Sequence, residues 1–267
     1  MKLAGSTVFV TGAGRGIGRA LALAAAAAGT RVAATDLRPE ELETLAAELG
    51  GDGHWTGALD VTDEAALEAA LAEAAERLGP IGVCFSNAGI ADGGDPISTP
   101  PAVWRRALDV NVGAHVTAAR ALLPSWLERG EGHFVATASA AGLLTQIGSA
   151  PYSVSKHACV AFAEWLSVTY GERGVGVSCI CPMGVDTAML RPGEDGALEG
   201  LGSRVVRGAG EVVSPESVAA QALAAVEEGG FLVLPHPEVL TYFQRKGADY
   251  ERWLGGMRRL QSASEDA

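Results

Sequence analysis

Three residues in the middle of the chain have the types and spacing needed for acid–base chemistry. Tyr152 and Lys156 lie four residues apart at the start of an expected helix, so their side chains share one face. An ammonium group beside a phenol favours the phenolate and allows proton exchange near neutral pH. Ser139 is expected at the end of a strand, where its hydroxyl can hydrogen-bond a substrate oxygen beside Tyr152. A Tyr-x-x-x-Lys pair is common by chance, so the order of the surrounding motifs has to support this interpretation.

A glycine-rich segment, Thr11-Gly12-Ala13-Gly14-Arg15-Gly16-Ile17-Gly18, follows the first expected strand and opens a helix. Gly12 permits a sharp turn, Gly16 lets the backbone approach a pyrophosphate, and Gly18 lets the helix pack on the sheet. The start of the helix offers free N–H groups and the positive end of its dipole. The alternative is a glycine-rich turn without a ligand. The strand before the turn, the helix after it and an acid ending the second strand favour a dinucleotide.

Two acidic residues end the second and third expected strands. Asp36, followed by Leu37, can accept hydrogen bonds from the hydroxyls of an adenosine ribose and would repel a 2′-phosphate, which favours NAD over NADP. Arg15 and Arg38 complicate this choice, because an arginine can pair with that phosphate. Asp60 and Val61 are placed to meet the adenine edge, although a helix-capping role for Asp60 is an almost equal alternative.

Strand-like runs alternate with helix-length segments along the chain. Apolar strands separated by helices predict an α/β fold, a doubly wound parallel seven-stranded sheet with helices on both faces in a single Rossmann domain over 1–267. The expected strands are Thr7–Thr11, Arg31–Asp36, Trp55–Val61, Ile81–Ser86, Gly132–Ser139, Val175–Cys181 and Phe231–Leu234. The expected helices are Gly16–Gly29, Pro39–Gly50, 62–78, Ala102–Leu127, Ser153–Arg173 and one beginning at Ser214.

The last third of the chain has two less regular parts. Pro182–Val213 lacks clear periodicity, and about 188–213 is expected to form a substrate lid. A helical extension is expected over about 238–260, with a frayed tail after Gln261. Its aromatic residues recur at roughly helical spacing, which favours packing, on this chain or on a neighbouring subunit, over a rim for the pocket.

Composition excludes several classes of partner. The 267 residues carry a net charge of −12, which argues against nucleic acid and against an anionic membrane surface. No apolar run has the length of a membrane span, and no signal peptide is visible. The four cysteines have no metal-binding spacing, so we expect no metal site, and their low number fits a reducing cytoplasm.

With these motifs in this order, the chain resembles the short-chain dehydrogenase/reductase superfamily from Gly5 to about Pro235. The resemblance rests on Thr11-Gly12-x-x-x-Gly16-x-Gly18, Asp60-Val61, Asn87-Ala88-Gly89, Asn111-Val112, Ser139 and Tyr152-Ser-Val-Ser-Lys156. It implies a catalytic tetrad of Asn111, Ser139, Tyr152 and Lys156.

The same resemblance implies further roles in cofactor binding. Asn87, Ala88 and Gly89 would steady the sheet and border the adenosine ribose, and Lys156 would also bind the nicotinamide ribose. Asn111 would distort its helix and hold a water in a proton relay, although a helix-packing hydrogen bond is the alternative from the residue alone. The family's usual Pro-Gly-x-Val-x-Thr reads Pro182-Met183-Gly184-Val185-Asp186-Thr187 here. Pro182, Val185 and Thr187 keep their places at the nicotinamide carboxamide, and Met183 replaces a glycine.

The expected activity is hydride transfer between a nicotinamide cofactor and a secondary alcohol or ketone, with Tyr152 as general acid and base. The expected pocket walls are mostly apolar, which favours a hydrophobic substrate. They are Ser139, Ala141, Leu143, Leu144, Gln146, Ser149, Met183 and Met189. The alternatives are an NADPH-dependent reductase of 3-ketoacyl thioesters and a dinucleotide-binding sensor without catalysis. By the same resemblance we expect a homo-oligomer, a dimer or tetramer, built through the two long helices around Asn111 and Tyr152.

Overall fold

The computed structural model describes residues 1–91, 93–191, 200–208 and 210–265. One sheet of seven parallel strands has the order β3-β2-β1-β4-β5-β6-β7, which confirms the predicted α/β class. The strands are β1 Thr7–Thr11, β2 Arg31–Asp36, β3 Trp55–Ala58, β4 Ile81–Ser86, β5 Gly132–Thr137, β6 Val175–Ile180 and β7 Leu232–Val233. The order changes direction between β1 and β4, and such a switch point is where open α/β sheets bind ligands.

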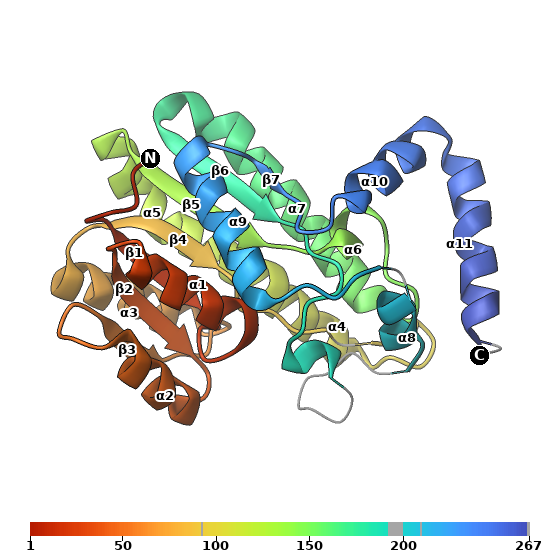
Figure 1. Cartoon of the computed structure of the whole chain (residues 1–267), viewed down its shortest axis with the longest axis horizontal. Helices are drawn as coiled ribbons and strands as arrows, with labels where there is room; N and C mark the ends of the chain where they lie inside the picture. The colour runs from red at the N-terminus through yellow and green to blue at the C-terminus, as the bar shows by residue number, and fades with distance from the viewer. Residues whose placement is uncertain (92, 192–199, 209, 266–267) are drawn as a thin grey trace.

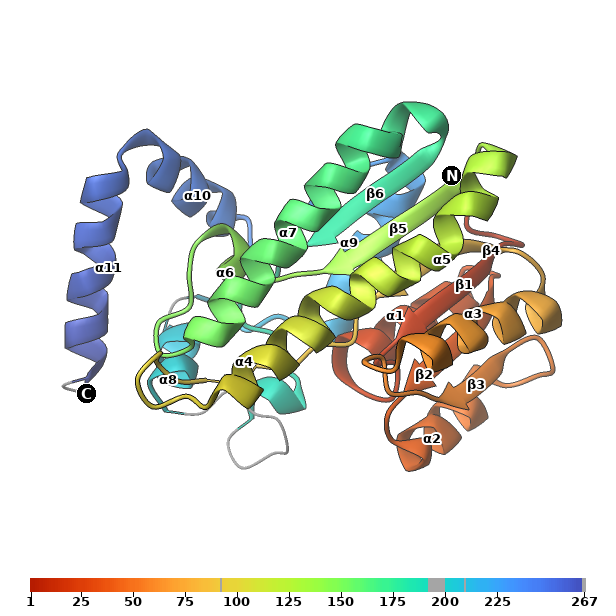
Figure 2. The same ribbon diagram turned by 180° about the vertical axis from the view of Figure 1, so that it is seen from behind.

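Helices cover both faces of the sheet (Figures 1 and 2). On one face lie α1 Gly16–Ala27, α2 Pro39–Leu49 and α9 Pro215–Glu228; on the other lie α3 Glu64–Leu78, α5 Ala114–Arg129 and α7 Ala150–Tyr170. Each face has its own apolar core, with Val8, Val10 and Leu21 on the first and Phe9, Trp126 and Phe134 on the second. Alternate residues of β1 thus point into opposite cores, as the pleat of a strand requires.

The remaining helices lie around the carboxyl ends of the strands or beyond them. They are α4 Pro101–Leu108, α6 Ala140–Leu143, α8 Gly200–Gly208, α10 Glu238–Ala248 and α11 Tyr250–Glu265. Three short turns of other helix types, η1 Asp109–Gly113, η2 Gly171–Arg173 and η3 Ala188–Leu190, complete the chain. Both views show α11 standing away from the sheet (Figures 1 and 2), and none of its described residues is buried.

Several predicted boundaries are wrong in ways that affect the site. The third strand ends at Ala58 rather than Val61, so Asp60 lies in a turn. The fifth strand ends at Thr137, and Ser139 instead caps the short helix α6, which the sequence did not predict. The seventh strand keeps only Leu232–Val233.

The other differences concern helices. The helix carrying Tyr152 begins at Ala150 rather than Ser153, with Pro151 in its first turn. The segment predicted to be irregular contains η3 and α8, and residues 192–199 and 209 of the expected lid lie outside the described residues. The tail predicted to be frayed after Gln261 is helical as far as Glu265.

The predicted long helix Ala102–Leu127 is interrupted at its centre. Between α4 and α5, the five residues Asp109–Gly113 form a π-helical turn, η1, with Asn111 at its middle. A π turn inserts one residue into an α-helix and is frequent at functional sites. This interruption is the distortion that the resemblance implied for Asn111.

Candidate active site

The turn between β1 and α1 is shaped by glycines. Gly12 and Gly16 have φ values of +63° and +56°, a region that favours glycine. A Cβ added to Gly12 would lie 2.9 Å from the Cα of Ala88, and one added to Gly18 would lie 2.0 Å from the Gly12 carbonyl oxygen. Any side chain at Gly12 or Gly18 would therefore collide with backbone, which keeps the start of α1 open.

Asn87, at the end of β4, holds this turn in place. Its Nδ2 donates to the carbonyl oxygens of Thr11 (3.0 Å) and Gly12 (3.3 Å), and its Oδ1 accepts from Thr137 Oγ1 at 3.1 Å. Thr11 Oγ1 in turn accepts the backbone N–H groups of Asn87 and Ala88 at 2.9 and 3.0 Å. The carboxyl ends of β1, β4 and β5 are thereby tied together around the mouth of the turn.

Asp36 lies at the end of β2 and is buried. Its carboxylate accepts the N–H of Gly14 at 2.9 Å and the N–H of Arg38 at 3.1 Å. A Cβ on Gly14 would lie 3.0 Å from the Asp36 Cγ, so Gly14 packs against this carboxylate instead of lining the cleft described below. The two backbone donors fix the orientation of Asp36 toward that cleft.

Asp60 is not a helix cap. Its Oδ1 accepts the backbone N–H and the hydroxyl of Thr62 at 2.9 and 2.7 Å, which closes a turn after β3. The cap of α3 is Asp63, whose Oδ1 accepts the N–H of Ala66 at 3.0 Å. Asp60 and Val61 are therefore left on the wall of the cleft.

Asn111 is fully buried, and its amide is occupied by protein partners. Oδ1 accepts the Ile90 N–H at 2.9 Å, while Nδ2 donates to the Ile90 carbonyl at 3.0 Å and to Ser155 Oγ at 2.9 Å. These bonds tie η1 to the loop after β4 and to α7. Because both Nδ2 hydrogens are used, a relay water would have to bind another atom of this residue.

The first two turns of α7 bring Tyr152 and Lys156 to the same place. Both side chains are buried, and the Lys156 Nζ lies 5.7 Å from the centroid of the Tyr152 ring. The ammonium also donates to the Thr137 carbonyl at the end of β5, at 2.8 Å. A Cβ on Gly89 would lie 3.2 Å from this Nζ, so the glycine leaves room for the lysine.

Ser139 lies at the start of α6 and lines the same cleft. Its Oγ accepts the Ala141 N–H at 3.1 Å and lies 3.4 Å from the Pro182 carbonyl, to which it donates. The serine therefore caps α6 and lines the cleft together with Tyr152.

These elements surround one cleft of about 560 Å³ at the carboxyl edge of the sheet. It brings together most of the predicted site residues, namely Gly12, Arg15, Gly16, Ile17, Gly18, Asp36, Leu37, Asp60, Val61, Asn87, Ala88, Gly89, Ser139, Gln146, Tyr152, Lys156, Pro182, Met183, Val185, Thr187 and Met189. The predicted residues that do not line it are Gly14, Asn111, Ala141, Leu143, Leu144 and Ser149. Ala141 is instead buried against Ala91 and Tyr152, and Leu144 packs on the core beneath α6.

The cleft also has walls that sequence reasoning missed, including Leu59, Ile90, Ala91, Arg106, Val110, Leu190 and Val206. Ile90 and Ala91 directly follow the Asn87–Gly89 motif, so their place could have been inferred. Arg106 on α4 and Val206 on α8 reach the cleft only through tertiary packing, which no local pattern records.

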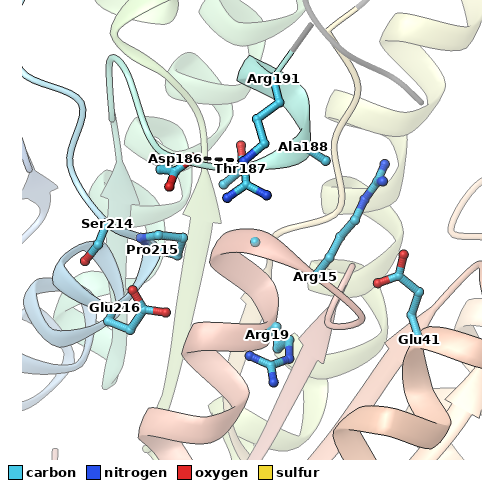
Figure 3. A pocket seen from close by; sticks show the side chains of 11 residues that line it. Arg15, Arg19, Glu41, Asp186, Thr187, Ala188, Arg191, Ser214, Pro215 and Glu216 are labelled. Carbon is cyan, nitrogen blue, oxygen red and sulfur yellow. Dashed lines mark hydrogen bonds and ion pairs between the residues drawn. The ribbon is translucent and has the colours of Figure 1, made fainter. Parts of the chain in front are cut away.

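A second, more polar pocket of about 440 Å³ continues from the cleft past Gly16 and Thr187 (Figure 3). It lies between the start of α1, the segment Asp186–Arg191 and the start of α9. Arg191 Nε donates to Asp186 Oδ1 at 3.0 Å, and this bond lowers the pKa of the aspartate. Both acidic and basic side chains line the pocket, so neither positive nor negative charge predominates there.

Two buried titratable groups, His115 and Cys159, lie close enough to Lys156 to be influenced by its charge. Burial, together with the charge of Lys156, lowers the pKa of His115 on α5 to about 3. Burial raises the pKa of the Cys159 thiol to about 11. Both groups are therefore neutral at physiological pH.

Two features are absent from the described part of the chain. No group of three or more His, Cys, Asp and Glu side chains could hold a metal ion among residues 1–91, 93–191, 200–208 and 210–265. No described helix combines the length and the apolarity needed to cross a membrane.

The sheet order, the glycine turn and the Ser–Tyr–Lys arrangement define a dinucleotide-binding oxidoreductase fold, and comparison with known families agrees. The family profile described as short chain dehydrogenase matches residues 6–198, and the chain belongs to this family. A short chain dehydrogenase/reductase from Burkholderia phymatum, solved in complex with NAD, superposes with a TM-score of 0.85 at 29% identity, covering 94% of this chain and 96% of the other.

Curated relatives are named dehydrogenases. The chain is 41% identical over 196 residues to 1-deoxy-11-beta-hydroxypentalenate dehydrogenase of Streptomyces avermitilis (72% of this chain, 73% of the relative). It is 37% identical over 190 residues to 2-keto-3-deoxy-L-fuconate dehydrogenase of Xanthomonas campestris, covering 71% of this chain and 61% of that relative. It is 32% identical over 233 residues to meso-2,3-butanediol dehydrogenase of Serratia marcescens (87% and 92%).

Proposed function

We propose that the protein is an NAD-dependent oxidoreductase that interconverts a secondary alcohol and a ketone. The observation that carries the proposal is the convergence of Ser139, Tyr152 and Lys156 on one wall of a cleft whose other end is the glycine turn. The relatives named above, all dehydrogenases, support the same class of reaction.

The cleft fits a dinucleotide on physical grounds. Side chains at Gly12 or Gly18 would collide with the backbone around the turn, and the start of α1 presents N–H groups there, which suits a pyrophosphate. Asp36 would accept the hydroxyls of the adenosine ribose and exclude a 2′-phosphate, with Asp60 and Val61 at the adenine edge. At the other end, Lys156 would bind the second ribose, and Val185 and Thr187 the carboxamide.

The protein's own residues would move the proton. In oxidation, Tyr152 as phenolate takes the proton of the alcohol, while Ser139 Oγ hydrogen-bonds the same oxygen as its charge changes. Lys156, fixed by the Thr137 carbonyl, keeps a positive charge near the phenol. In reduction, Tyr152 returns the proton to the carbonyl oxygen. The nicotinamide, when bound, accepts or supplies the hydride.

The substrate end of the cleft favours a hydrophobic alcohol or ketone. Ala91, Met183, Met189, Leu190 and Val206 form most of its lining, with Gln146 as a polar contact. An apolar lining of this kind favours binding of a substrate that carries apolar surface near the reacting carbon. The substrate proposal is therefore a secondary alcohol with an apolar substituent.

The outer face of α7 supports the proposal of a homo-oligomer. Val154, Trp165 and Val168 are exposed there at helical spacing, with Val168 85% exposed. A row of exposed apolar side chains on one helix is more typical of a subunit interface than of a solvated surface. The four cysteines are free and buried, which is compatible with the proposed cytoplasmic location.

A panel of alcohols tests the function. The panel should include 2-butanol, 2-octanol, cyclohexanol and 1-phenylethanol, each with NAD and with NADP, and NADH or NADPH formation is read by absorbance. We expect turnover with NAD, strongest for the apolar members, and a loss of at least about 10³-fold in Tyr152→Phe with NADH binding retained. Tyr170→Phe, at the far end of α7, serves as the matched control.

Two other outcomes would redirect the proposal. Arg15 and Arg38 line the cleft near Asp36, and this observation favours the alternative of an NADPH-dependent ketoreductase. Faster turnover of acetoacetyl thioesters with NADPH would support that alternative. NADH binding without turnover of any alcohol or ketone would support the non-catalytic sensor.

A further inference from the structure

A lysine far from the catalytic residues in sequence is buried beside them. Lys246 lies on α10 with a side chain that is 8% exposed. Its Nζ donates to the carbonyl oxygens of Leu143 (2.8 Å) and Leu144 (2.9 Å). Lysine is almost never buried unless its charge has partners, so these contacts need an explanation.

The two carbonyls lie at the end of α6, the helical turn that begins with Ser139. A four-residue helix leaves its last carbonyls without intrahelical partners, and a cation there also favours the dipole. Ser139 caps the first end through the Ala141 N–H, and Lys246 satisfies the last end. One turn of helix is thus held between a catalytic hydroxyl and a buried ammonium.

Lys246 also contacts the helix that carries Tyr152 and Lys156. His157 Nδ1 lies 2.8 Å from the Ser153 carbonyl, which can only accept, so in the neutral imidazole Nδ1 carries the hydrogen and Nε2 is the acceptor. This Nε2 lies 3.5 Å from the Lys246 Nζ. The three ammonium hydrogens therefore face two carbonyls of α6 and one imidazole nitrogen of α7.

The two helices that Lys246 joins are in direct backbone contact. A Cβ on Gly142 of α6 would lie 2.4 Å from the carbonyl oxygen of Lys156 on α7. A shift of α6 therefore changes its distance from the backbone of the catalytic lysine. It also moves Ser139 relative to Tyr152, since the serine is the first cap of the same turn.

The aromatic residues of the C-terminal helix cover this ammonium. Its Nζ lies 5.0 Å from the ring centroid of Trp253 and 5.7 Å from that of Tyr250. Such ring faces attract a cation. This contact explains part of the aromatic pattern near the end of the chain, because Tyr250 and Trp253 contact a lysine of the same chain.

We propose that Lys246 is a positioning residue that sets the place of Ser139 against Tyr152 by holding the end of α6 to α7, with Tyr250 and Trp253 as its cover. The proposal rests on the proposed function for the role of Ser139. Through this lysine, the C-terminal helices take part in the geometry of proton transfer without touching the substrate.

Kinetics of Lys246→Met against wild type are the first test. Methionine is unbranched and only one atom shorter than lysine, and it loses all three donors. We expect kcat/KM for the best alcohol of the panel to fall at least about tenfold, with the affinity for NADH, measured by its fluorescence, unchanged. Lys246→Arg keeps the charge and donors and should recover most of the loss. Arg245→Met, an exposed neighbour on α10, controls for the loss of one positive charge.

A double-mutant cycle separates positioning from general destabilisation. If Lys246 acts through Ser139, Lys246→Met should have little further effect on kcat/KM in a Ser139→Ala background. An equal loss in both backgrounds, or wild-type kcat/KM in Lys246→Met, would overturn the proposal. If Lys246→Met does not fold, Trp253→Leu removes only the cover and should lower kcat/KM in the same way, again only when Ser139 is present.

A readout without turnover keeps this test separate from the proposed function. The N–H groups of Gly142 and Leu144 bond within α6, to the Ser139 and Ala140 carbonyls. Their hydrogen exchange should accelerate at least about tenfold in Lys246→Met and stay unchanged in Arg245→Met. If wild type turns over no substrate, the proposed function fails, and this exchange still decides whether Lys246 holds α6. Unchanged exchange would contradict it.

Discussion

His115 should make the fold sensitive to mild acid, and replacing it should remove that sensitivity. The imidazole is fully buried on α5, with its Nε2 3.7 Å from Cys159 Sγ and its ring edge-on to Phe134. Its Nδ1 has no hydrogen-bond partner among the described residues. Burial, and next to it the charge of Lys156, lowers the pKa of His115 from 6.5 to about 3. The folded protein therefore binds fewer protons at this position than the unfolded chain.

The sign and size of the effect follow from that difference. Because the pKa is lower in the folded state, stability is lost as the pH falls below 6.5 and continues to fall until about pH 3. One pKa unit corresponds to about 1.36 kcal/mol. Between pH 7 and pH 5 this group alone lowers the free energy of unfolding by about 2 kcal/mol.

Urea unfolding at pH 7 and at pH 5, in wild type and in His115→Leu, measures the contribution of His115 to the free energy of unfolding. Leucine has a similar volume and nothing to protonate, so its loss of unfolding free energy between the two pH values should be about 2 kcal/mol smaller. Protein concentration is held constant, because an oligomer's stability depends on it. Cys159→Ala, which removes the neighbour and keeps the imidazole, should be less stable at both pH values and keep the full acid loss. Equal acid losses in wild type and His115→Leu would refute the reasoning.

Three further substitutions probe the cleft. Gly18→Ala would place a Cβ 2.0 Å from the Gly12 carbonyl oxygen, so NADH affinity, measured by fluorescence, should fall at least about tenfold. Asn111→Asp loses two donors and sets a carboxylate against the Ile90 carbonyl, so urea unfolding should show a loss of about 3 kcal/mol. Asp36→Ser removes the carboxylate that would repel a 2′-phosphate, so the ratio of kcat/KM for NADPH over NADH should rise at least about tenfold.

Matched controls accompany the glycine and the aspartate substitutions. Gly53→Ala adds a methyl group with nothing within 4 Å and should leave NADH affinity unchanged. Asp52→Ser removes an exposed carboxylate and should not alter the NADPH-to-NADH ratio. Wild-type unfolding free energy in Asn111→Asp would show that the amide bonds of η1 do not stabilise the fold.

The sheet and the residues at the glycine-turn end of the cleft could be predicted because local chemistry determines their places. Thr7–Thr11 and Ile81–Ser86 are short apolar runs bounded by turn residues, and a strand buried on both faces requires such a run. Once the strand boundaries are predicted, the glycines after β1 and the acid that ends β2 are located directly. Parallel strands end at the same edge of a sheet, so their distance in sequence does not matter.

The part of the cleft that α6 and α8 form could not be predicted to the same extent. The α6 turn is four residues long, and its two ends are satisfied by Ser139 and by Lys246, which lies 102 residues after Leu144. The α8 helix contains three glycines, which disfavour helix formation, yet it forms and brings Val206 to the cleft. Such positions depend on distant packing, which a sequence window does not contain.

The π turn at Asp109–Gly113 makes this region sensitive to the number of its residues as well as to the identity of their side chains. Each residue of an α-helix rotates the following side chains by about 100°. Deleting one residue within the turn would restore ordinary helical bonding from α4 to α5 and remove the widened turn around Asn111, whereas deleting one residue outside it would rotate the face of α4 that bears Arg106 by about a quarter of a revolution relative to α5. Insertions and deletions between Pro101 and Arg129 should therefore be tolerated less well than exchanges of single side chains.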